Sequence, residues 1–197
     1  TARRWLEGYQ RGSRFYEPVL REAPSGSDAV TWGEMVEARL LAEFRTRVPV
    51  QRMRPAIVEL RKEFGRYPLA LARPFLSSEG KELVRVVQDK LGLENELRLV
   101  VVRNGQLMLG NAVDRFSAAV EYEDEVVTRF KPNQRTPAVA MDPEHAFGQP
   151  AIGNVRTDAL AEDMRAGASI AELADLYDLT PAQVDEAIRF ELIAGRE

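Results

Sequence analysis

Apolar residues recur at helical spacing in two stretches of the first third of the chain. The first stretch begins at Thr31, which has Glu34 at capping-box spacing, and it ends before Pro49. The second ends at Gly65, and Pro55 near its start removes one backbone donor. The apolar faces of these two predicted helices are Trp32, Val36, Leu40 and Phe44 in the first, and Met53, Ile57, Leu60 and Phe64 in the second.

Three more helices are predicted in the last quarter of the chain because each has a clear start signal. Thr157 is the predicted N-cap of the first. Capping boxes open the second, with Ser169 and Glu172, and the third, with Thr180 and Gln183. We expect these helices to enclose one apolar cluster in a helix-turn-helix arrangement. Its expected members are Leu160, Met164, Ile170, Leu173, Ala174, Tyr177, Val184, Ala187 and Ile188.

The middle of the chain alternates short apolar runs, such as ELVRVVQ and LRLVVV, with turn signals. Asn104-Gly105 predicts a two-residue hairpin turn, AVDRFSAAV predicts a helix, and VEYEDEVVTRF predicts a second hairpin that turns at its acidic centre. KPNQRTPAV reads as a linker. The expected fold is therefore mainly α with small β elements. Its predicted parts are an N-terminal domain at 1–72, a β-hairpin connector at 73–136 and a three-helix domain at 137–197.

The N-terminal segment has the order of a DNA-recognition helix followed by a wing. TARRWLEGY predicts a short helix that Thr1 caps and Gly8 ends, SRFYEPVLRE predicts a short strand, and APSGSD predicts a loop. Arginines on such a helix and strand contact phosphates or base edges. The predicted DNA-binding residues are Arg3, Arg4, Arg11 and Arg14. A basic solvated edge without a ligand is the alternative interpretation.

Charge is distributed unevenly along the chain. Residues 1–73 hold 14 Arg or Lys against 9 Asp or Glu, whereas residues 154–197 hold 4 against 10. The basic front and acidic end predict two surfaces with different partners, one of them a polyanion. In the last predicted helix, Asp185, Glu186 and Glu191 stand against Arg189 alone. A DNA duplex would repel that surface, so the pattern favours protein binding or self-association there.

Composition argues against several functional classes. No apolar run approaches the roughly 18 residues of a membrane span. The absence of cysteine fits a reducing compartment, which predicts a cytoplasmic protein. A hydrolase or metalloenzyme would have to use His145, the single histidine, with the acidic cluster Glu121, Glu123, Asp124 and Glu125. We interpret these as a loop histidine and a solvated hairpin tip, and we expect no enzyme activity, metal or cofactor.

Two resemblances cover most of the chain. RRWLEGY, the turn-rich wing, TWGEMVEARLL and VELRKEFG resemble a MerR-like winged helix-turn-helix and, more narrowly, the N-terminal domain of a group of VapB antitoxins. In MerR-like domains another helix precedes a segment like TARRWLEGY, so the resemblance implies that this chain begins inside the motif. The region from MDPEHAFGQP to PAQVDEAIRFE resembles a small antitoxin domain of unknown function found beside nuclease-like toxin genes. It matches in G-x-P at 148–150, Arg156-Thr157, Ala166-Gly167 and the run from Thr180 to Ile188.

The resemblances imply a type II antitoxin that neutralises a PIN-domain ribonuclease toxin and represses its own operon by binding operator DNA. We expect DNA binding as a homodimer, since such motifs use two half-sites. Inhibition of the toxin is expected to occur by occlusion, with Arg189 and Phe190 as candidate toxin-binding residues. The alternative is a stand-alone MerR-like transcriptional regulator without a toxin partner, whose middle region senses a ligand.

Overall fold

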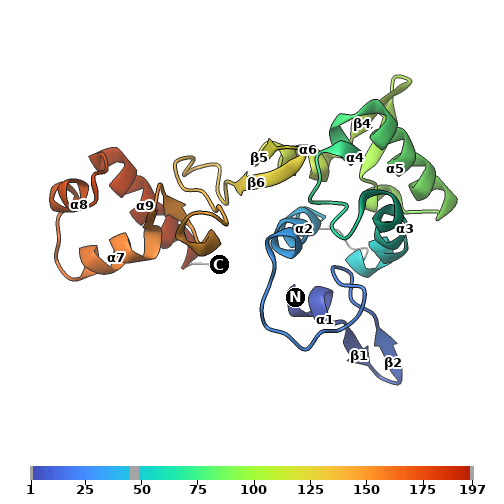
Figure 1. Cartoon of the computed structure of the whole chain (residues 1–197), viewed down its shortest axis with the longest axis horizontal. Helices are drawn as coiled ribbons and strands as arrows, with labels where there is room; N and C mark the ends of the chain where they lie inside the picture. The colour runs from blue at the N-terminus through green and yellow to red at the C-terminus, as the bar shows by residue number, and fades with distance from the viewer. Residues whose placement is uncertain (1, 45–48, 196–197) are drawn as a thin grey trace. The chain divides into compact units, whose positions relative to one another are not determined.

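The computed structural model describes residues 2–44 and 49–195, and it is mainly α-helical with small β elements (Figure 1). The predicted N-cap Thr1 lies outside the described residues. The helices are α1 (Ala2–Glu7), α2 (Trp32–Ala42), α3 (Arg54–Phe64), α4 (Arg73–Leu76), α5 (Ser78–Lys90), α6 (Asn111–Ser117), α7 (Thr157–Arg165), α8 (Ile170–Tyr177) and α9 (Pro181–Ala194), with 3-10 turns η1 (Val50–Met53), η2 (Asn95–Leu97) and η3 (Ala146–Gly148). The strands pair as β1 (Tyr9–Arg11) with β2 (Arg14–Tyr16), β3 (Val100–Arg103) with β4 (Gln106–Leu109), β5 (Val120–Glu123) with β6 (Val126–Phe130), and β7 (Ala151–Ile152) with β8 (Val155–Arg156).

The chain forms two compact units, and the division between them passes through β5 and β6. The N-terminal unit takes the residues up to 118 together with 122–127, and the C-terminal unit takes 119–121 and the residues from 128 onward. This differs from the predicted three-part division. Residues 73–118, expected to be part of a connector, pack in the same unit as the N-terminal helices, and the predicted linker KPNQRTPAV belongs to the C-terminal unit.

In the N-terminal unit, the predicted apolar faces form the core. Val36, Leu40, Ile57 and Leu60 are each at most 1% exposed. The capping box that begins at Thr31 is present at the start of α2, as predicted. Proline is tolerated in the first helical turn, where the backbone N–H has no intrahelical partner, and α3 therefore accommodates its proline near the start without a break.

The run ELVRVVQ forms part of α5, although its β-branched residues suggested a strand. Ser77 caps this helix, and its side chain accepts a hydrogen bond from the Gly80 N–H at 2.9 Å. Buried Gln88 at the other end of α5 joins the helix to the start of β3. Its side chain accepts from the N–H groups of Leu99 at 2.6 Å and Val100 at 3.0 Å, and donates to the Val100 carbonyl at 2.8 Å.

Both predicted hairpins in the middle of the chain are present. Asn104 and Gly105 have φ values of 51° and 74°, as a type I′ turn between β3 and β4 requires. The turn between β5 and β6 lies at Asp124 and Glu125, the acidic centre of its segment, also with positive φ. The indole N–H of Trp32 donates to the Val127 carbonyl at 2.6 Å and ties the turn end of this second hairpin to the N-terminal unit.

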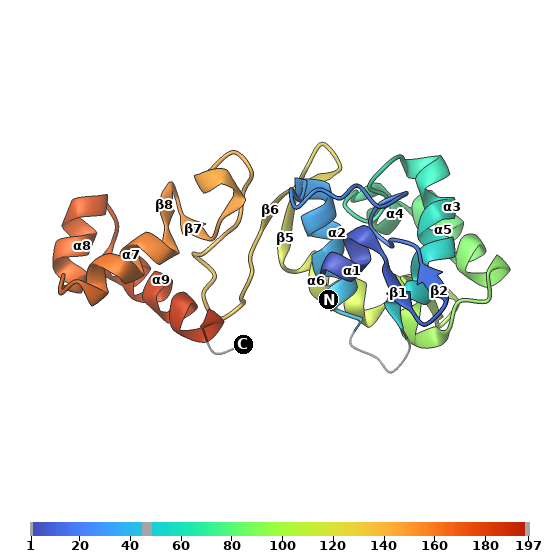
Figure 2. The ribbon, with the colours of Figure 1, turned by 90° about the horizontal axis from the view of Figure 1, so that it is seen from below.

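The C-terminal unit contains the three predicted helices, and Figure 2 shows α7, α8 and α9 packed together. All nine residues expected in their apolar cluster lie in it, either buried or partly buried. The capping boxes at Ser169 and Thr180 are present. The predicted N-cap Thr157 is wrong, because Arg156 occupies that position and Thr157 is the first helical residue. The Thr157 hydroxyl instead lies within hydrogen-bond distance of the Pro150 carbonyl, at 3.2 Å.

Candidate nucleic-acid interface

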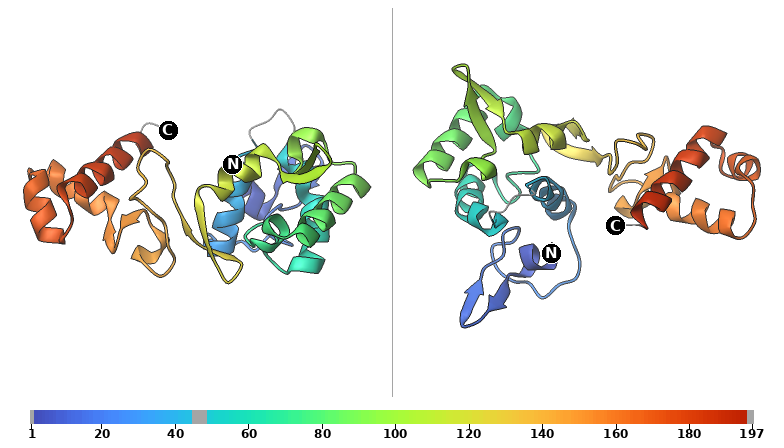
Figure 3. Two further views of the ribbon diagram at one scale, coloured as in Figure 1. Left: turned by 90° about the horizontal axis from the view of Figure 1, so that it is seen from above. Right: turned by 180° about the vertical axis from the view of Figure 1, so that it is seen from behind.

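The four predicted DNA-binding arginines come from one short helix and one hairpin. Arg3 and Arg4 lie on α1, whereas Arg11 and Arg14 face each other as the last pair of the β1–β2 ladder. All four side chains are exposed. We call this set the basic N-terminal face. Figures 1 and 3 show β1 and β2 extending away from the helices of their unit, which leaves the hairpin accessible to a large ligand.

The sequence suggested one strand after α1, but the structure has two. Gly12 turns the chain between them with φ of +62°. Gly8 precedes β1 with φ of +71°, and a side chain there would clash, because an added Cβ would lie 2.4 Å from the Tyr16 carbonyl oxygen. The hairpin brings Tyr9 opposite Tyr16 in register.

Two tyrosine rings hold two of the arginines in place. The rings of Tyr9 and Tyr16 stack with centroids 4.9 Å apart and an angle of 6° between their planes. The Arg4 guanidinium carbon lies 5.2 Å from the Tyr9 centroid, and that of Arg14 lies 5.0 Å from the Tyr16 centroid. Cation–π contacts at these distances orient guanidinium groups while leaving their N–H donors free to bind an anion. Sequence reasoning missed this stack because the cross-strand register was not visible without the turn at Gly12.

The carboxylate nearest to Arg3 does not neutralise the basic N-terminal face. Arg3 Nη2 lies 4.0 Å from Asp28 Oδ1, and both side chains are more than four-fifths exposed. An ion pair this long and this exposed contributes little, since water and salt screen it. The charge of Arg3 therefore remains available to a phosphate.

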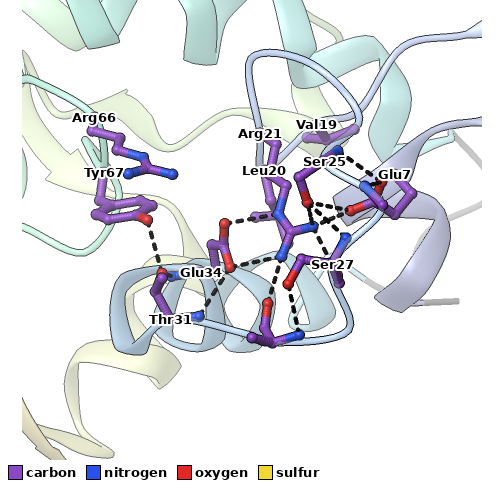
Figure 4. A network of polar contacts seen from close by, with 12 residues as sticks. Glu7, Val19, Leu20, Arg21, Ser25, Ser27, Thr31, Glu34, Arg66 and Tyr67 are labelled. Atoms are coloured by element: carbon purple, nitrogen blue, oxygen red, sulfur yellow. Dashed lines mark hydrogen bonds and ion pairs between the residues drawn. The ribbon is translucent and has the colours of Figure 1, made fainter.

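A buried ionic network fixes α1, and with it the basic N-terminal face, against α2 (Figure 4). Arg21 lies at its centre and donates from Nε to Glu34 Oε1 at 2.9 Å and from Nη2 to the Ala29 carbonyl at 2.7 Å. Its Nη1 group pairs with Glu7 at the end of α1. Glu7 also accepts from the backbone N–H groups of Ser25 at 2.9 Å and Gly26 at 2.8 Å. The network therefore joins α1, the loop after the hairpin, and α2.

The charges in this network stabilise one another. The hydrogen bond to Glu34 is the main cause that raises the pKa of Arg21, with smaller contributions from Glu7. Burial is the largest single effect on Glu34 and opposes its ionisation, but the hydrogen bonds from Arg21 and the Thr31 N–H, together with the charges of Arg21 and Arg66, outweigh it, so the pKa of Glu34 is lowered. The Gly26 N–H is the largest cause that lowers the pKa of Glu7. All three groups are therefore charged at neutral pH, and removal of one would leave a buried charge without its partner.

The carboxyl group of Glu37 in α2 is also buried, but its pKa is raised, whereas that of Glu34 is lowered. The side chain is 0% exposed, and this burial raises the pKa of Glu37 to about 8. Its Oε1 accepts from the Leu69 N–H at 2.7 Å, while among the described residues its Oε2 has no hydrogen-bond partner. Glu37 is therefore largely protonated at neutral pH, which avoids a buried negative charge.

A cavity of about 600 Å³ adjoins the ionic network in the N-terminal unit. Its lining is polar, but Arg21 and Glu34 already satisfy each other. Another lining residue, Arg61, donates to the carbonyls of Val19 at 3.0 Å and Leu20 at 2.7 Å. Much of the polar capacity around the cavity is therefore engaged within the protein.

The two candidate toxin-binding residues lie in different environments. Arg189 is exposed and forms an ion pair with Asp185, one turn earlier in α9. Phe190 is only 9% exposed and belongs to the apolar cluster of the C-terminal unit. Its packing explains its presence without a partner protein. Sequence reasoning omitted Phe190 from that cluster, although it lies three residues after Ala187 and thus on the same helical face.

Some of the carboxylates in α9 have structural roles. Glu186 accepts a hydrogen bond from the Ala138 N–H at 2.7 Å, and Glu191 contacts the Thr157 hydroxyl. These contacts tie α9 to the segments before and at the start of α7. Position alone did not reveal them, because their partners are 34 to 48 residues away in sequence.

His145 and Glu121 of the acidic hairpin each have a charged partner of their own. His145 Nδ1 lies 2.9 Å from Asp142 Oδ2, and Glu121 pairs with Lys131 at 2.8 Å. Within residues 2–44 and 49–195, no three His, Asp or Glu side chains gather as metal ligands would. Over the same residues, every helix is too short or too polar to cross a bilayer.

Comparisons with known proteins match nearly the whole chain. "Uncharacterized protein Rv2308" of Mycobacterium tuberculosis (strain ATCC 25618 / H37Rv) is 38% identical over 199 residues, which cover 96% of this chain and 82% of that protein. "Putative antitoxin VapB45" of the same organism is 29% identical over 206 residues, covering 95% and 85%. The crystal structure of Rv2018 from Mycobacterium tuberculosis superposes with a TM-score of 0.68 at 29% identity, covering 87% of this chain and 85% of that one.

A family model described as a protein of unknown function (DUF433) matches residues 139–190. This match falls within the C-terminal unit and contains α7 and α8 and most of α9. The longer match, at 38% identity, spans both units. On that evidence the chain belongs to the same protein family as uncharacterized protein Rv2308 of Mycobacterium tuberculosis.

Proposed function

We propose that this protein is the antitoxin of a type II toxin–antitoxin system. The observation that carries the proposal is the match to "Putative antitoxin VapB45", because it extends over 95% of the chain and therefore includes both units. The DUF433 match agrees with the antitoxin-like domain expected at the C-terminal end. In this proposal the chain is a cytoplasmic binding protein without catalytic activity of its own.

The N-terminal unit would bind operator DNA through its basic N-terminal face. Four exposed arginines on α1 and the β1–β2 hairpin support this assignment, as does the rigid attachment of α1 through Arg21. The helix and hairpin would act as the recognition helix and wing of a MerR-like motif. A homodimer would place two such faces on two half-sites of the operator and repress the operon that encodes the protein.

The C-terminal unit would bind the toxin, a PIN-domain ribonuclease. Its acidic balance, with 4 Arg or Lys against 10 Asp or Glu in residues 154–197, disfavours nucleic acid and favours a protein partner with a basic surface. Arg189 and Phe190 remain candidates for this contact, although the buried position of Phe190 makes Arg189 the more accessible of the two.

Native mass spectrometry after co-expression with the neighbouring reading frame tests the proposal. One chain only carries the tag, so an untagged partner is recovered only through the complex. We expect a stable heteromeric mass, which also gives the stoichiometry. A homodimer that leaves the neighbouring product behind under these conditions would contradict the toxin-binding part.

The alternative function is a stand-alone MerR-like regulator that senses a small ligand. The cavity of about 600 Å³ beside the network of Arg21 and Glu34 favours it, because ligand binding there would act on the attachment of α1. Operator binding by a homodimer without any protein partner, altered by a small molecule, would support this alternative over the antitoxin.

A further inference from the structure

Phe147 is the most exposed large apolar side chain among the described residues, at 97%. Burying a phenylalanine instead of leaving it in water stabilises a protein by roughly 1.5–3 kcal/mol, so full exposure forgoes that gain. The ring is not part of the apolar cluster that α7, α8 and α9 enclose. Its position therefore has no explanation in the packing of its own unit.

The backbone around Phe147 holds the ring outward. Ala146, Phe147 and Gly148 have φ values of 47°, 54° and 74°, so three successive residues adopt the left-handed conformation. Residues other than glycine rarely adopt it, and strained backbone of this kind concentrates at binding sites. The strain at Phe147 is a second cost at the same residue, independent of the exposure of its ring.

The loop that carries Phe147 is well fixed by hydrogen bonds. The Asp142 carboxylate accepts from the Glu144 N–H at 2.8 Å and lies 2.9 Å from His145 Nδ1. The Gly148 N–H donates to the His145 carbonyl at 3.0 Å. At the base of the loop, the backbone groups of Ala140 and Ala151 exchange two hydrogen bonds of 2.9 Å each. Phe147 is thus presented from a preorganised turn, which lowers the entropy lost on binding.

Charge indicates the kind of surface that this ring would enter. Asp142 and Glu144 lie in the same loop, and residues 154–197 carry the acidic excess described above. A basic protein surface with a pocket for a flat ring is complementary to this combination. A nuclease that binds single-stranded RNA needs such a surface, because Lys and Arg hold the phosphates and apolar or aromatic groups stack on the bases.

We propose that Phe147 is the anchor by which the C-terminal unit occupies the RNA-binding surface of the toxin, with the ring in the position of a base and the surrounding carboxylates in the positions of phosphates. This inference rests on the proposed antitoxin function and gives the expected occlusion a specific residue. The toxin would be inhibited because its substrate and the Phe147 loop compete for one surface.

The test measures the affinity of the wild-type chain and two variants for a catalytically inactive toxin, together with their thermal unfolding. Glycine adopts the φ of this position without strain, so Phe147→Gly is expected to leave the melting temperature unchanged or raised. We expect the same change to weaken toxin binding at least about tenfold, as the loss of a central aromatic anchor does. Leu176→Ser is the matched control, because Leu176 is 70% exposed in the same unit but lies on α8 with helical backbone, and it should leave affinity unchanged.

A second measurement asks whether RNA and the protein share one surface. A labelled single-stranded RNA is bound to the inactive toxin, and the wild-type protein should displace it, whereas Phe147→Gly should need at least about tenfold more protein. A ternary complex with RNA still bound, or wild-type affinity of Phe147→Gly, would overturn the inference while the antitoxin function stands. If the wild-type protein does not bind the toxin at all, the proposed function fails and the inference fails with it.

Discussion

Single buried charged residues decide how the N-terminal unit is assembled, and the sequence did not distinguish them. Glu34 was predicted as a capping-box residue, and it has that role, but it also pairs with Arg21. Glu37 lies three residues later in the same helix and is fully buried. Their partners lie in loops whose paths depend on the tertiary fold. A charge pattern along the chain therefore cannot predict which glutamates are buried.

Glu37 gives the folding stability a specific dependence on pH. Because folding raises the pKa of Glu37 from its ordinary value of 4.5 to about 8, the folded state binds the proton more tightly than the unfolded state. Its stabilising contribution is complete below pH 4.5 and is lost as the pH rises towards 8, at about 1.4 kcal/mol per pH unit within that window.

We predict that Glu37→Gln removes this part of the pH dependence. Denaturant unfolding of both proteins between pH 5 and 8 measures the difference, since glutamine keeps an acceptor for the Leu69 N–H and does not titrate. The free energy of unfolding of the wild type should fall relative to the variant as the pH rises. Parallel curves would contradict the raised pKa.

Substitutions of Phe190 and Arg189 should differ in their effect on the stability of the C-terminal unit. We predict that Phe190→Ala lowers the free energy of unfolding of the C-terminal unit by about 3 kcal/mol, because it leaves a cavity in the apolar cluster. Arg189→Ala, which removes an exposed ion pair with Asp185, should change it by less than about 0.5 kcal/mol. Chemical denaturation gives both values. An equal effect of the two substitutions would contradict the assignment of Phe190 to the core.

At the scale of elements, local start and turn signals predicted the structure best. Capping boxes at Thr31, Ser169 and Thr180 and the hairpin turn at Asn104-Gly105 are all present, because each depends on residues within a few positions. The run ELVRVVQ was misleading. Its β-branched residues favour strands, but packing of Val84 and Val87 on one buried face selects a helix.

The role of α1 and the β1–β2 hairpin in DNA binding can be tested with one arginine from each. Replacing Arg4 and Arg14 with glutamine removes two positive charges from the basic N-terminal face. If both contact phosphates, the slope of log affinity against log salt should become less steep by about 1.8. Titration of operator DNA at several salt concentrations measures the slope, and Arg165→Gln on α7 in the other unit is the control. An unchanged slope in the double variant would refute the assignment.

Tyr9 and Tyr16 carry no charge, but we expect them to affect DNA binding because their rings orient Arg4 and Arg14. Tyr16→Leu removes the ring beneath Arg14 and half of the stack. We predict weaker operator binding with the salt slope preserved, because both guanidinium groups keep their charge while that of Arg14 loses its fixed orientation. The same salt titration separates this outcome from direct charge loss. A reduced slope in Tyr16→Leu would contradict a positioning role.

At the scale of the whole molecule, the sequence predicted the fold class but not the two-unit division. KPNQRTPAV has the composition of a linker, yet Val139 at its end is fully buried in the C-terminal unit, and the Ala138 N–H donates a hydrogen bond to the Glu186 carboxylate. The sequence pattern assigned residues 73–118 to a separate connector, although they belong to the same compact unit as the N-terminal helices. Which segments share a core depends on long-range contacts that composition does not report.

The candidate surfaces also differ in how far the sequence predicted them. The arginines of the basic N-terminal face could be predicted, because the sequence shows several arginines on a predicted helix and the predicted strand that follows it. The strained turn at Phe147 was not, because DPEHAFGQP reads as an ordinary loop and positive φ at an alanine and a phenylalanine has no sequence signal. Binding residues on loops often escape prediction for this reason.

Titration of the toxin's ribonuclease activity with this protein tests the central claim most directly. The proposed toxin, expressed from the neighbouring reading frame, is mixed with increasing amounts of the wild-type chain, and cleavage of a labelled RNA is followed. An antitoxin predicts that cleavage falls in proportion to the added protein and stops at the stoichiometry of the complex. Full cleavage in the presence of excess protein would contradict the account and leave the regulator alternative in its place.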